Sequence, residues 1–297
     1  MTEIATELST LRDLVRWGAS EFSRHGLVFG HGTDNAIDEA LQLVLHALHL
    51  DYDLPEAYLD CHLTENEKTG VLALFRQRIE KRMPAAYLTG KAWFAGLEFE
   101  VTPDVLVPRS PIAELIQKGF DPWVQPENVG RILDLCTGSG CIGIAAAVRF
   151  SDAEVDLVDI SIKALQVAGR NIEKHHLGHR VHEIQSDLFN EIPEERQYDL
   201  IISNPPYVSR GEYASLPEEY RQEPMIGLEA GEDGMDLVAR ILARAKRYLA
   251  PGGIIIIEVG ASAELLLKRF PQYPFLWLDF EYGGDGVFLL TRDQLVE

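Results

Sequence analysis

The chain has 297 residues, of which 46% are hydrophobic and 25% are charged. This length favours a main domain of roughly 150 to 200 residues with a smaller companion, and the composition excludes a largely disordered, collagen-like or coiled-coil protein. The 47 Asp and Glu residues outnumber the 27 Lys and Arg residues, which gives a net charge of −20. Such a chain repels phosphate backbones, so we expect a basic or neutral partner and no stable binding of nucleic acid.

The three cysteines are odd in number and lack paired metal-ligand spacing, which indicates neither a disulfide framework nor a zinc site. Acidic residues interrupt the first 24 residues, and this excludes the apolar core of a signal peptide. No apolar run approaches the roughly 20 residues that a bilayer span requires. We therefore expect a cytoplasmic protein without a membrane partner and without a metal.

The first ninety residues have the pattern of helices. Residues 34–50 place apolar side chains at helical spacing, and a capping-box pattern from Thr64 to Glu67 predicts a second helix that Pro84 ends. Because no catalytic cluster occurs here, residues 1–90 are predicted to be a helical domain that recognises the substrate. Residues 91–111 are short aromatic and β-branched pieces, which predict a strand-pair connector.

Residues 112–297 alternate apolar strand candidates with helical segments. The strand candidates are continuously apolar, which is typical of parallel strands buried on both faces. They cover residues 132–136, 155–159, 181–186, 200–203 and 254–259. At the end, residues 275–281 and 287–291 flank a glycine-rich stretch, which predicts an antiparallel hairpin with a tight turn. The fold class is therefore α/β, with a doubly wound sheet.

A glycine loop follows the first of these strands. Its residues, Thr137-Gly138-Ser139-Gly140, and Gly143 beyond them match the dinucleotide fingerprint, in which small residues let a ligand approach the backbone. Asp159 closes the next strand, at a distance that suits an acceptor for ribose hydroxyls. These residues predict a nucleoside-containing ligand. The alternative is that the glycines only form a tight turn and that Asp159 caps the following helix.

Two more carboxylates follow strands of the same sheet. Asp134 lies in the approach to the glycine loop, and Asp187 ends the third strand. Asp187 could accept a hydrogen bond from an adenine amino group while an apolar neighbour covers the ring, or it could cap a turn. Because ligands bind beyond the carboxyl ends of parallel strands, we expect these residues to form one ligand-binding edge.

The tetrapeptide Asn204-Pro205-Pro206-Tyr207 directly follows the fourth strand. Two prolines keep the backbone extended and remove two amide hydrogens, so the loop is rich in acceptors. The Asn204 oxygen and a proline carbonyl could hold both hydrogens of a planar NH2 group while Tyr207 stacks on its plane. The alternative is a proline-stiffened surface turn.

In this order, the glycine loop, Asp159, Asp187 and the tetrapeptide resemble the class I S-adenosylmethionine methyltransferases that methylate planar amide or amino nitrogens. The resemblance runs from about residue 97 to the C-terminus. Leu106-Val107-Pro108-Arg109 and residues 229–236 are similar to the protein-glutamine N5-methyltransferases. This family implies a Rossmann-like, mostly parallel seven-stranded sheet over residues 112–297 and S-adenosyl-L-methionine as the cofactor.

The resemblance also assigns roles to individual residues. Catalysis falls to Asn204, Pro205 and Tyr207. The protein substrate is held by Asn204, Pro205, Pro206 and Tyr207. The cofactor is held by Asp134, Thr137, Gly138, Ser139, Gly140, Asp159, Asp187, Leu188 and Asn204. Leu188 stands where family members often carry an aromatic residue, so Phe189 is a second candidate for covering the adenine.

Residues 107–116 are similar to the branch that methylates the third protein of the large ribosomal subunit, a basic partner. The branch that acts on peptide-chain release factors is the alternative, and it usually carries a different sequence after its Pro-Arg. A DNA adenine-N6 methyltransferase uses a similar tetrapeptide, but the charge of −20 opposes it. An NAD-dependent oxidoreductase and a non-catalytic binding module remain as further alternatives, although neither explains the tetrapeptide.

Several other residues receive structural interpretations. His175, His176 and His179 indicate a solvated helix end rather than a metal site, and Cys136 and Cys141 are interpreted as packing residues. Arg109 could meet a carboxylate of substrate or cofactor, or it could form an interdomain ion pair. The N-terminal helices are expected to dock the basic substrate through a surface that carries most of the net charge.

Overall fold

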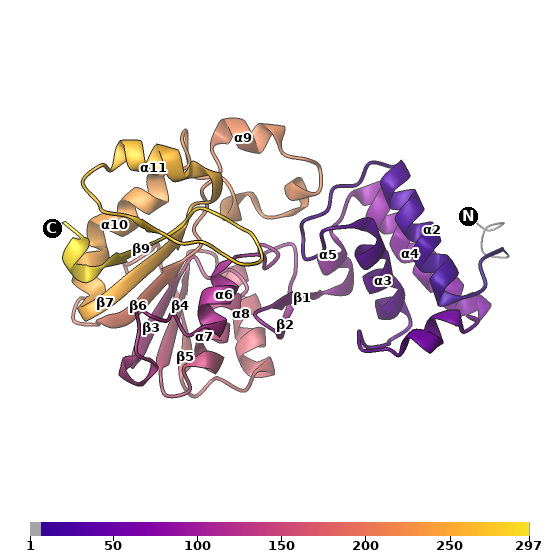
Figure 1. Cartoon of the computed structure of the whole chain (residues 1–297), viewed down its shortest axis with the longest axis horizontal. Coiled ribbons are helices and arrows are strands. Elements are labelled where there is room, and N and C mark those ends of the chain that lie inside the picture. The colour runs from indigo at the N-terminus through magenta and orange to yellow at the C-terminus, as the bar shows by residue number, and fades with distance from the viewer. Residues whose placement is uncertain (1–6, 297) are drawn as a thin grey trace. The chain divides into compact units, whose positions relative to one another are not determined.

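The computed structural model describes residues 7–296, so the first six residues of the predicted helical domain lie outside the described residues (Figure 1). The chain divides into two compact units. The helical unit comprises residues 1–91 together with residues 217–222, and the sheet unit comprises residues 92–216 and 223–297. A short segment from the C-terminal half of the chain therefore completes the helical unit.

In residues 7–91, the helical unit packs four α-helices around its own core. They are α2 (Leu11–Arg24), α3 (Ala36–Ala47), α4 (Glu65–Lys81) and α5 (Ala85–Thr89), with a 3-10 turn, η1 (Glu56–Asp60), before α4. The Thr64 hydroxyl accepts a hydrogen bond from the Glu67 amide, and the Glu67 carboxylate accepts one from the Thr64 amide. This capping box confirms the predicted start of α4.

A buried ion cluster ties residues 217–222 into this unit. Arg78 is fully buried and lies 2.5 Å from Glu39 and 3.4 Å from Glu219. Glu219 also accepts a hydrogen bond from the Val28 amide at 3.0 Å. Because a buried charge without its partner is costly, this cluster fixes the place of the segment within the unit.

The predicted strand pair is present as a two-stranded sheet, β1 (Lys91–Phe94) and β2 (Leu97–Glu100). The connecting Ala95 and Gly96 have φ angles of 50° and 85°. Two successive positive φ angles are typical of the tight turn that joins hairpin strands.

A seven-stranded sheet forms the centre of the sheet unit, in the order β5-β4-β3-β6-β7-β9-β8. The first five strands of this order are parallel, and β9 is antiparallel to β7 and to β8. The strands are β3 (Arg131–Leu135), β4 (Glu154–Asp159), β5 (Val181–Gln185), β6 (Tyr198–Ser203), β7 (Leu249–Glu258), β8 (Leu276–Trp277) and β9 (Val287–Thr291). The strands β4 and β5 lie on one side of β3, and β6 and β7 lie on the other. A ligand crevice is expected at β3, where the strand order reverses.

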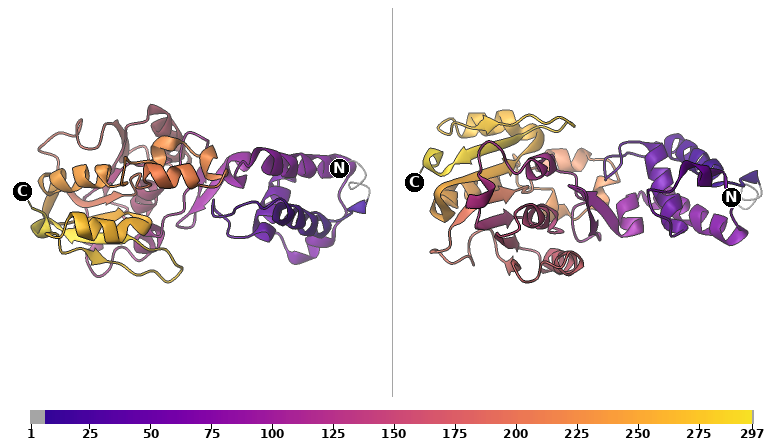
Figure 2. Two further views of the ribbon diagram at one scale, coloured as in Figure 1. Left: turned by 90° about the horizontal axis from the view of Figure 1, so that it is seen from above. Right: turned by 60° about the horizontal axis from the view of Figure 1, so that its bottom comes forward.

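Helices cover both faces of this sheet (Figures 1 and 2). One face packs against α6 (Ile112–Gln117), α7 (Cys141–Arg149) and α8 (Ile162–Lys174), and the other packs against α10 (Asp236–Tyr248) and α11 (Ala263–Arg269). A short helix, α9 (Arg210–Ser215), precedes residues 217–222. Successive strand residues serve opposite cores, as Ile132 and Leu133 do, which confirms the predicted doubly wound architecture. Within residues 7–296, no helix has the length and hydropathy of a membrane span.

The C-terminal hairpin differs from the prediction. The strand β8 has only two residues, and residues 278–286 form a long connection rather than a tight turn. The carboxylate of Glu114 in α6 accepts hydrogen bonds from the amides of Glu281 and Tyr282, each at 3.0 Å. Because a side chain occupies these amides, the strand cannot continue to residue 281 as predicted.

Candidate active site

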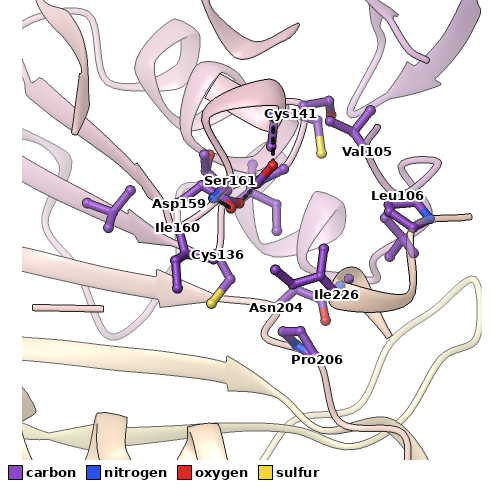
Figure 3. A pocket seen from close by; sticks show the side chains of 18 of the residues that line it. Val105, Leu106, Cys136, Cys141, Asp159, Ile160, Ser161, Asn204, Pro206 and Ile226 are labelled. Atoms are coloured by element: carbon purple, nitrogen blue, oxygen red, sulfur yellow. Dashed lines mark hydrogen bonds between the residues drawn. The ribbon is translucent and has the colours of Figure 1, made fainter. Parts of the chain in front are cut away.

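A cavity of about 280 Å³ opens at the carboxyl ends of the parallel strands (Figure 3). Its lining comes from the ends of β3, β4, β5 and β6 and from two segments, residues 104–110 and 224–229. All of these residues belong to the sheet unit. In Figure 3, Asp159 and Ser161 project from the end of one strand, and Asn204 and Pro206 follow another. Asp159, Asp187 and Asn204, from three different strand ends, therefore line one pocket.

The glycine loop forms the wall beyond β3. Gly138 and Gly140 have φ angles of 56° and 81°, a region that favours glycine, and Gly140 stands immediately before α7. A Cβ atom on Gly143 would lie 2.2 Å from Leu157. Glycine at this position therefore lets α7 pack closely on β4. Thr137, Gly138 and Ser139 line the cavity, whereas Gly140 turns the chain behind it.

Asp134 lies beneath the glycine loop and not in the cavity lining. Its Oδ2 accepts hydrogen bonds from Thr137 Oγ1 at 2.5 Å and from the Gly143 amide at 2.9 Å. Burial raises the pKa of this carboxyl to about 7, although the two hydrogen bonds favour the ionised form. The side chain thus holds the two ends of the loop together from behind.

Asp159 is in the cavity wall at the end of β4. Its carboxylate accepts hydrogen bonds from the Gly138 and Ser161 amides, both at 2.9 Å. Burial raises the pKa of Asp159, and these amides oppose the shift. A carboxylate has about four acceptor positions, so further positions remain for a ligand such as a ribose diol. Asp159 therefore both braces the glycine loop and meets the requirement for binding a nucleoside.

The end of β5 supplies an apolar and a charged group. Leu188 lines the cavity, and Asp187 beside it forms an ion pair with Arg240 at 2.6 Å. Phe189 is fully buried and stacks on Tyr248 with ring centroids 4.6 Å apart. The suggestion that Phe189 shares the adenine-covering role is wrong, because its ring is committed to the core. Leu188, unlike Phe189, is among the residues that line the cavity.

The tetrapeptide forms the wall beyond β6. Asn204 and Pro206 line the cavity, whereas Pro205 and Tyr207 are not among its lining residues. The Tyr207 hydroxyl donates to Glu258 Oε1 at 3.2 Å, and the ring lies where a Cβ on Gly260 would be 2.8 Å away. Burial and the charge of Glu258 raise the pKa of Tyr207. Its hydroxyl is therefore a stable donor rather than a base.

Sequence reasoning missed two carboxylates near this end of the pocket. Glu258 ends β7 after four isoleucines, and it accepts a hydrogen bond from Ser110 Oγ at 2.5 Å. Glu223 binds the guanidinium of Arg109 with both oxygens, at 2.6 and 2.7 Å. A charged residue at the end of an otherwise apolar strand is the one signal that could have indicated Glu258. Arg109 and Glu223 both belong to the sheet unit, so the predicted interdomain pair is instead an ion pair within it.

The histidines and cysteines of the described chain have structural surroundings. Among residues 7–296, no three His, Cys, Asp or Glu side chains are grouped to hold a metal ion. His175 hydrogen-bonds to the Glu98 carbonyl at 3.0 Å, and burial lowers its pKa. Burial raises the pKa of Cys141 to about 12, and it raises the pKa of Cys136 as well. Neither thiol is therefore a ready nucleophile.

Four features surround this pocket. They are a loop of small residues, a carboxylate with free acceptor positions at the next strand end, an apolar side chain, and an acceptor-rich tetrapeptide. The fold and the pocket define an S-adenosylmethionine-dependent methyltransferase of class I, and the residues present fit the adenosine part of that cofactor. Residues 122–217 match the model of a family described as "Methyltransferase small domain".

Two relatives, both named "Ribosomal protein uL3 glutamine methyltransferase", extend the match over nearly the whole chain. The protein of Xanthomonas campestris pv. campestris is 51% identical over 98% of this chain and 94% of its own length. The protein of Francisella tularensis subsp. tularensis is 47% identical over 99% of this chain and 94% of its own length. The chain belongs to the family of the ribosomal protein uL3 glutamine methyltransferases.

A solved structure is similar in fold alone. The hMettl16 catalytic domain, in complex with a MAT2A 3'UTR hairpin, aligns with a TM-score of 0.51 and 14% identity. The alignment covers 93% of this chain and 89% of that one. At this identity the likeness supports the class I architecture and no particular substrate.

Proposed function

We propose that this protein transfers a methyl group from S-adenosylmethionine to the side-chain amide nitrogen of a glutamine in ribosomal protein uL3. The observation that carries the proposal is the tetrapeptide at residues 204–207, of which Asn204 and Pro206 line the pocket that fits the cofactor. The names of the two relatives support uL3 as the substrate. A ribosomal substrate also supports a cytoplasmic location.

The chemistry requires the protein to make a poor nucleophile react. An amide lone pair is delocalised into the carbonyl, the same resonance that gives a peptide bond a rotational barrier of about 18 to 20 kcal/mol. The bound cofactor supplies an electrophilic methyl group. A C–N bond forms to the glutamine as the C–S bond breaks, and the nitrogen loses a proton to become a neutral secondary amide.

In this proposal the tetrapeptide acts as a clamp. The side-chain oxygen of Asn204 and the carbonyl of Pro205 accept hydrogen bonds from the two NH2 hydrogens of the substrate. These bonds strengthen as positive charge develops on nitrogen, so they stabilise the transition state more than the ground state. Pro206 shapes the pocket, and Tyr207 braces the loop. Proton loss follows methyl transfer, so no side chain is assigned as a general base.

A direct test uses labelled S-adenosylmethionine with purified uL3, a peptide-chain release factor and duplex DNA in separate reactions. We expect label in uL3 alone, and mass spectrometry should place the added methyl on a glutamine. Preference for the release factor would reject the proposed substrate branch. Label in DNA would reject protein methylation, and inactivity toward all three would reject the proposal as a whole.

The helical unit is proposed to select the protein substrate. We assign recognition to residues 1–90, a connecting role to residues 91–111 and the chemistry to residues 112–297. This division is supported by the pocket, all of whose lining residues lie in the sheet unit. The helical unit has 16 acidic and 10 basic residues and the sheet unit has 31 and 17, so the expectation that the helices carry most of the negative charge is wrong.

Charge reversal in the full chain tests docking without removing the helical unit. Asp51→Lys with Asp53→Lys alters an exposed stretch between α3 and η1, and should lower kcat/KM for uL3 by a factor that shrinks as salt rises. Glu194→Lys with Glu195→Lys is the matched control, because it lies before β6, at the end of the strand opposite the pocket. Equal effects of both pairs would reject docking on the helical unit.

A further inference from the structure

Three arginines on one side of α10 bind the segment between β5 and β6. Their spacing is i, i+4 and i+7, which places them on the same face of the helix. Each donates to a side-chain oxygen of the segment: Arg240 to Asp187 at 2.6 Å, Arg244 to Asn190 at 2.6 Å, and Arg247 to Glu194. This arginine row therefore fastens the segment to α10 at three points.

The contact between Arg240 and Asp187 differs from the other two in its position. Both of these residues line the cavity, whereas Arg244 and Arg247 do not. Asp187 Oδ2 accepts from Arg240, and across residues 7–296 no second donor binds this carboxylate. Because a carboxylate has about four acceptor positions, Oδ1 can accept a hydrogen bond from a ligand.

The backbone around Asp187 is held from both sides. The Ser186 amide donates to the Asp159 carbonyl at 3.0 Å, and the buried Ser186 hydroxyl donates to the Leu188 carbonyl at 2.8 Å. The Asp187 side chain is 39% exposed, so its rotamer is the remaining freedom. A partner that holds one carboxylate oxygen determines where the other oxygen points, and Arg240 is that partner.

Under the proposed function, the strand order indicates which part of the cofactor lies here. In an adenosyl group, the base and the sulfur are attached at opposite ends of the ribose. Asp159 at the end of β4 is the acceptor for the ribose, and the methyl group must reach Asn204 at the end of β6. The strands lie in the order β5-β4-β3-β6, so the base extends toward the end of β5 and Asp187.

We infer that Arg240 is a positioning residue for the cofactor, because it holds Asp187 with Oδ1 toward the 6-amino group of the adenine. Leu188 and Leu237 line the cavity beside this carboxylate and supply apolar contacts to the ring. A base without the amino group leaves the carboxylate oxygen without a donor, so the ion pair makes the pocket selective for adenine. The inference rests on the proposed function, since the methyl acceptor at Asn204 sets the direction of the cofactor.

Calorimetric titration of the full chain with two ligands tests this inference. The ligands are S-adenosylhomocysteine, which has no methyl group to transfer, and its analogue whose base lacks the 6-amino group. Wild type should bind the analogue about 10-fold more weakly, at the low end for a hydrogen bond to a charged group because Asp187 is partly exposed. Arg240→Met keeps an unbranched apolar side chain but removes the guanidinium, and it should bind the two ligands with nearly equal Kd.

A double-mutant cycle and a control separate positioning from general support. Asp187→Ala should also bind the two ligands with nearly equal Kd, and adding Arg240→Met should not change that ratio further, because both changes act through one carboxylate. Arg247→Met is the matched control. It breaks the contact with Glu194 in the same arginine row, outside the cavity lining, and should keep the wild-type ratio.

Three outcomes would overturn the inference. They are nearly equal Kd values in wild type, a wild-type ratio in Arg240→Met, and loss of the ratio in Arg247→Met. Weakening of both ligands by one factor in Arg240→Met leaves the ratio unchanged, so it counts as the second outcome. If Arg240→Met fails to fold, Arg240→Gln, which is shorter than arginine and uncharged, takes its place with the same expectation.

No protein substrate takes part in these titrations, so the two proposals can fail separately. A wild type that methylates uL3 but binds both ligands equally would overturn the inference alone. A wild type that shows the expected ratio but transfers no methyl group to uL3 would overturn the proposed function and leave the selectivity for adenine in place. A wild type that binds neither ligand would overturn both.

Discussion

The two ends of the pocket hold their carboxylates in different ways. At the glycine-loop end, the backbone amides of Gly138 and Ser161 hold Asp159. At the tetrapeptide end, side-chain hydroxyls hold Glu258, with Ser110 at 2.5 Å. Backbone donors are in place once the turn forms, whereas side-chain donors must also be kept in one rotamer. The difference indicates that the turn itself organises the first end, whereas the second depends on side chains from several segments.

The largest expected effect is on the rate of methyl transfer, and it comes from a substitution in the tetrapeptide alone. Asn204→Ala should lower the single-turnover rate by about 10²- to 10³-fold, as the loss of a preorganised polar group does at other active sites. The Kd for S-adenosylmethionine should change little, because Asp159 and the glycine loop remain. Rapid-quench measurements at saturating uL3 test the rate, and calorimetry tests the Kd. A rate within a few-fold of wild type would contradict the amide clamp.

A substitution at the glycine-loop end should instead weaken cofactor binding and leave the rate at saturation largely unchanged. Asp159→Ala removes an acceptor for the ribose and the brace of Gly138, and hydrogen bonds that involve a charged group contribute about 1.5 to 3 kcal/mol. We expect a corresponding rise in the Kd for S-adenosylmethionine, measured by calorimetric titration. At saturating cofactor, the rate of methyl transfer should largely recover. An unchanged Kd in a folded variant would mean that the ribose lies elsewhere.

The same contrast explains what the sequence could predict. The glycine loop and Asp159 are local features, because their spacing along one strand-loop-helix unit already specifies the turn and its acceptor. The network of Glu258 joins Ser110, Tyr207 and the end of β7, segments that meet only because β6 and β7 are neighbours in the sheet. Strand patterns do not reveal that order, so this end of the site could be predicted only in part.

Two features of the fold escaped prediction for a related reason. Residues 217–222 complete the helical unit through Glu219, whose partner Arg78 lies 141 residues earlier in the chain. The strand predicted to reach residue 281 ends at Trp277, and the amides of Glu281 and Tyr282 bind the carboxylate of Glu114. Both outcomes depend on one charged side chain from a distant segment. The pattern of hydrophobic residues predicted the five parallel strands, but it carries no information about such contacts.

A smaller effect, on the pH dependence of stability, should come from Asp134, the buried carboxylate behind the glycine loop. Because the pKa of Asp134 is raised to about 7, the folded protein retains a proton that the unfolded chain releases, and stability falls as pH rises from about 4 to 7. Between pH 6 and pH 8 this group should cost ~1 kcal/mol in the free energy of unfolding. Asp134→Asn should flatten that part of the pH dependence in urea unfolding. The control is Asp156→Asn, at another buried carboxylate, which lies on β4 and accepts from the Tyr198 hydroxyl, and this variant should retain the pH dependence. An equal slope in wild type and Asp134→Asn would contradict the assignment.

The smallest expected effect lies at the outer edge of the tetrapeptide end, in the 278–286 connection. Glu114→Gln keeps the shape of the side chain but replaces a carboxylate that accepts from Glu281 and Tyr282 with an amide that has a single acceptor oxygen. The pKa of Glu114 is lowered, chiefly by the Tyr282 amide, so the ionised form supports the connection above the ordinary glutamate pKa and loses this role as pH falls. At neutral pH the variant should exchange amide hydrogens faster at residues 281 and 282, while protection of β9 stays the same. Lowering the pH should reduce the protection of these two amides in wild type more than in the variant, once both are corrected for intrinsic exchange. If the two amides keep their wild-type protection in Glu114→Gln, something other than this carboxylate holds residues 281 and 282 in place.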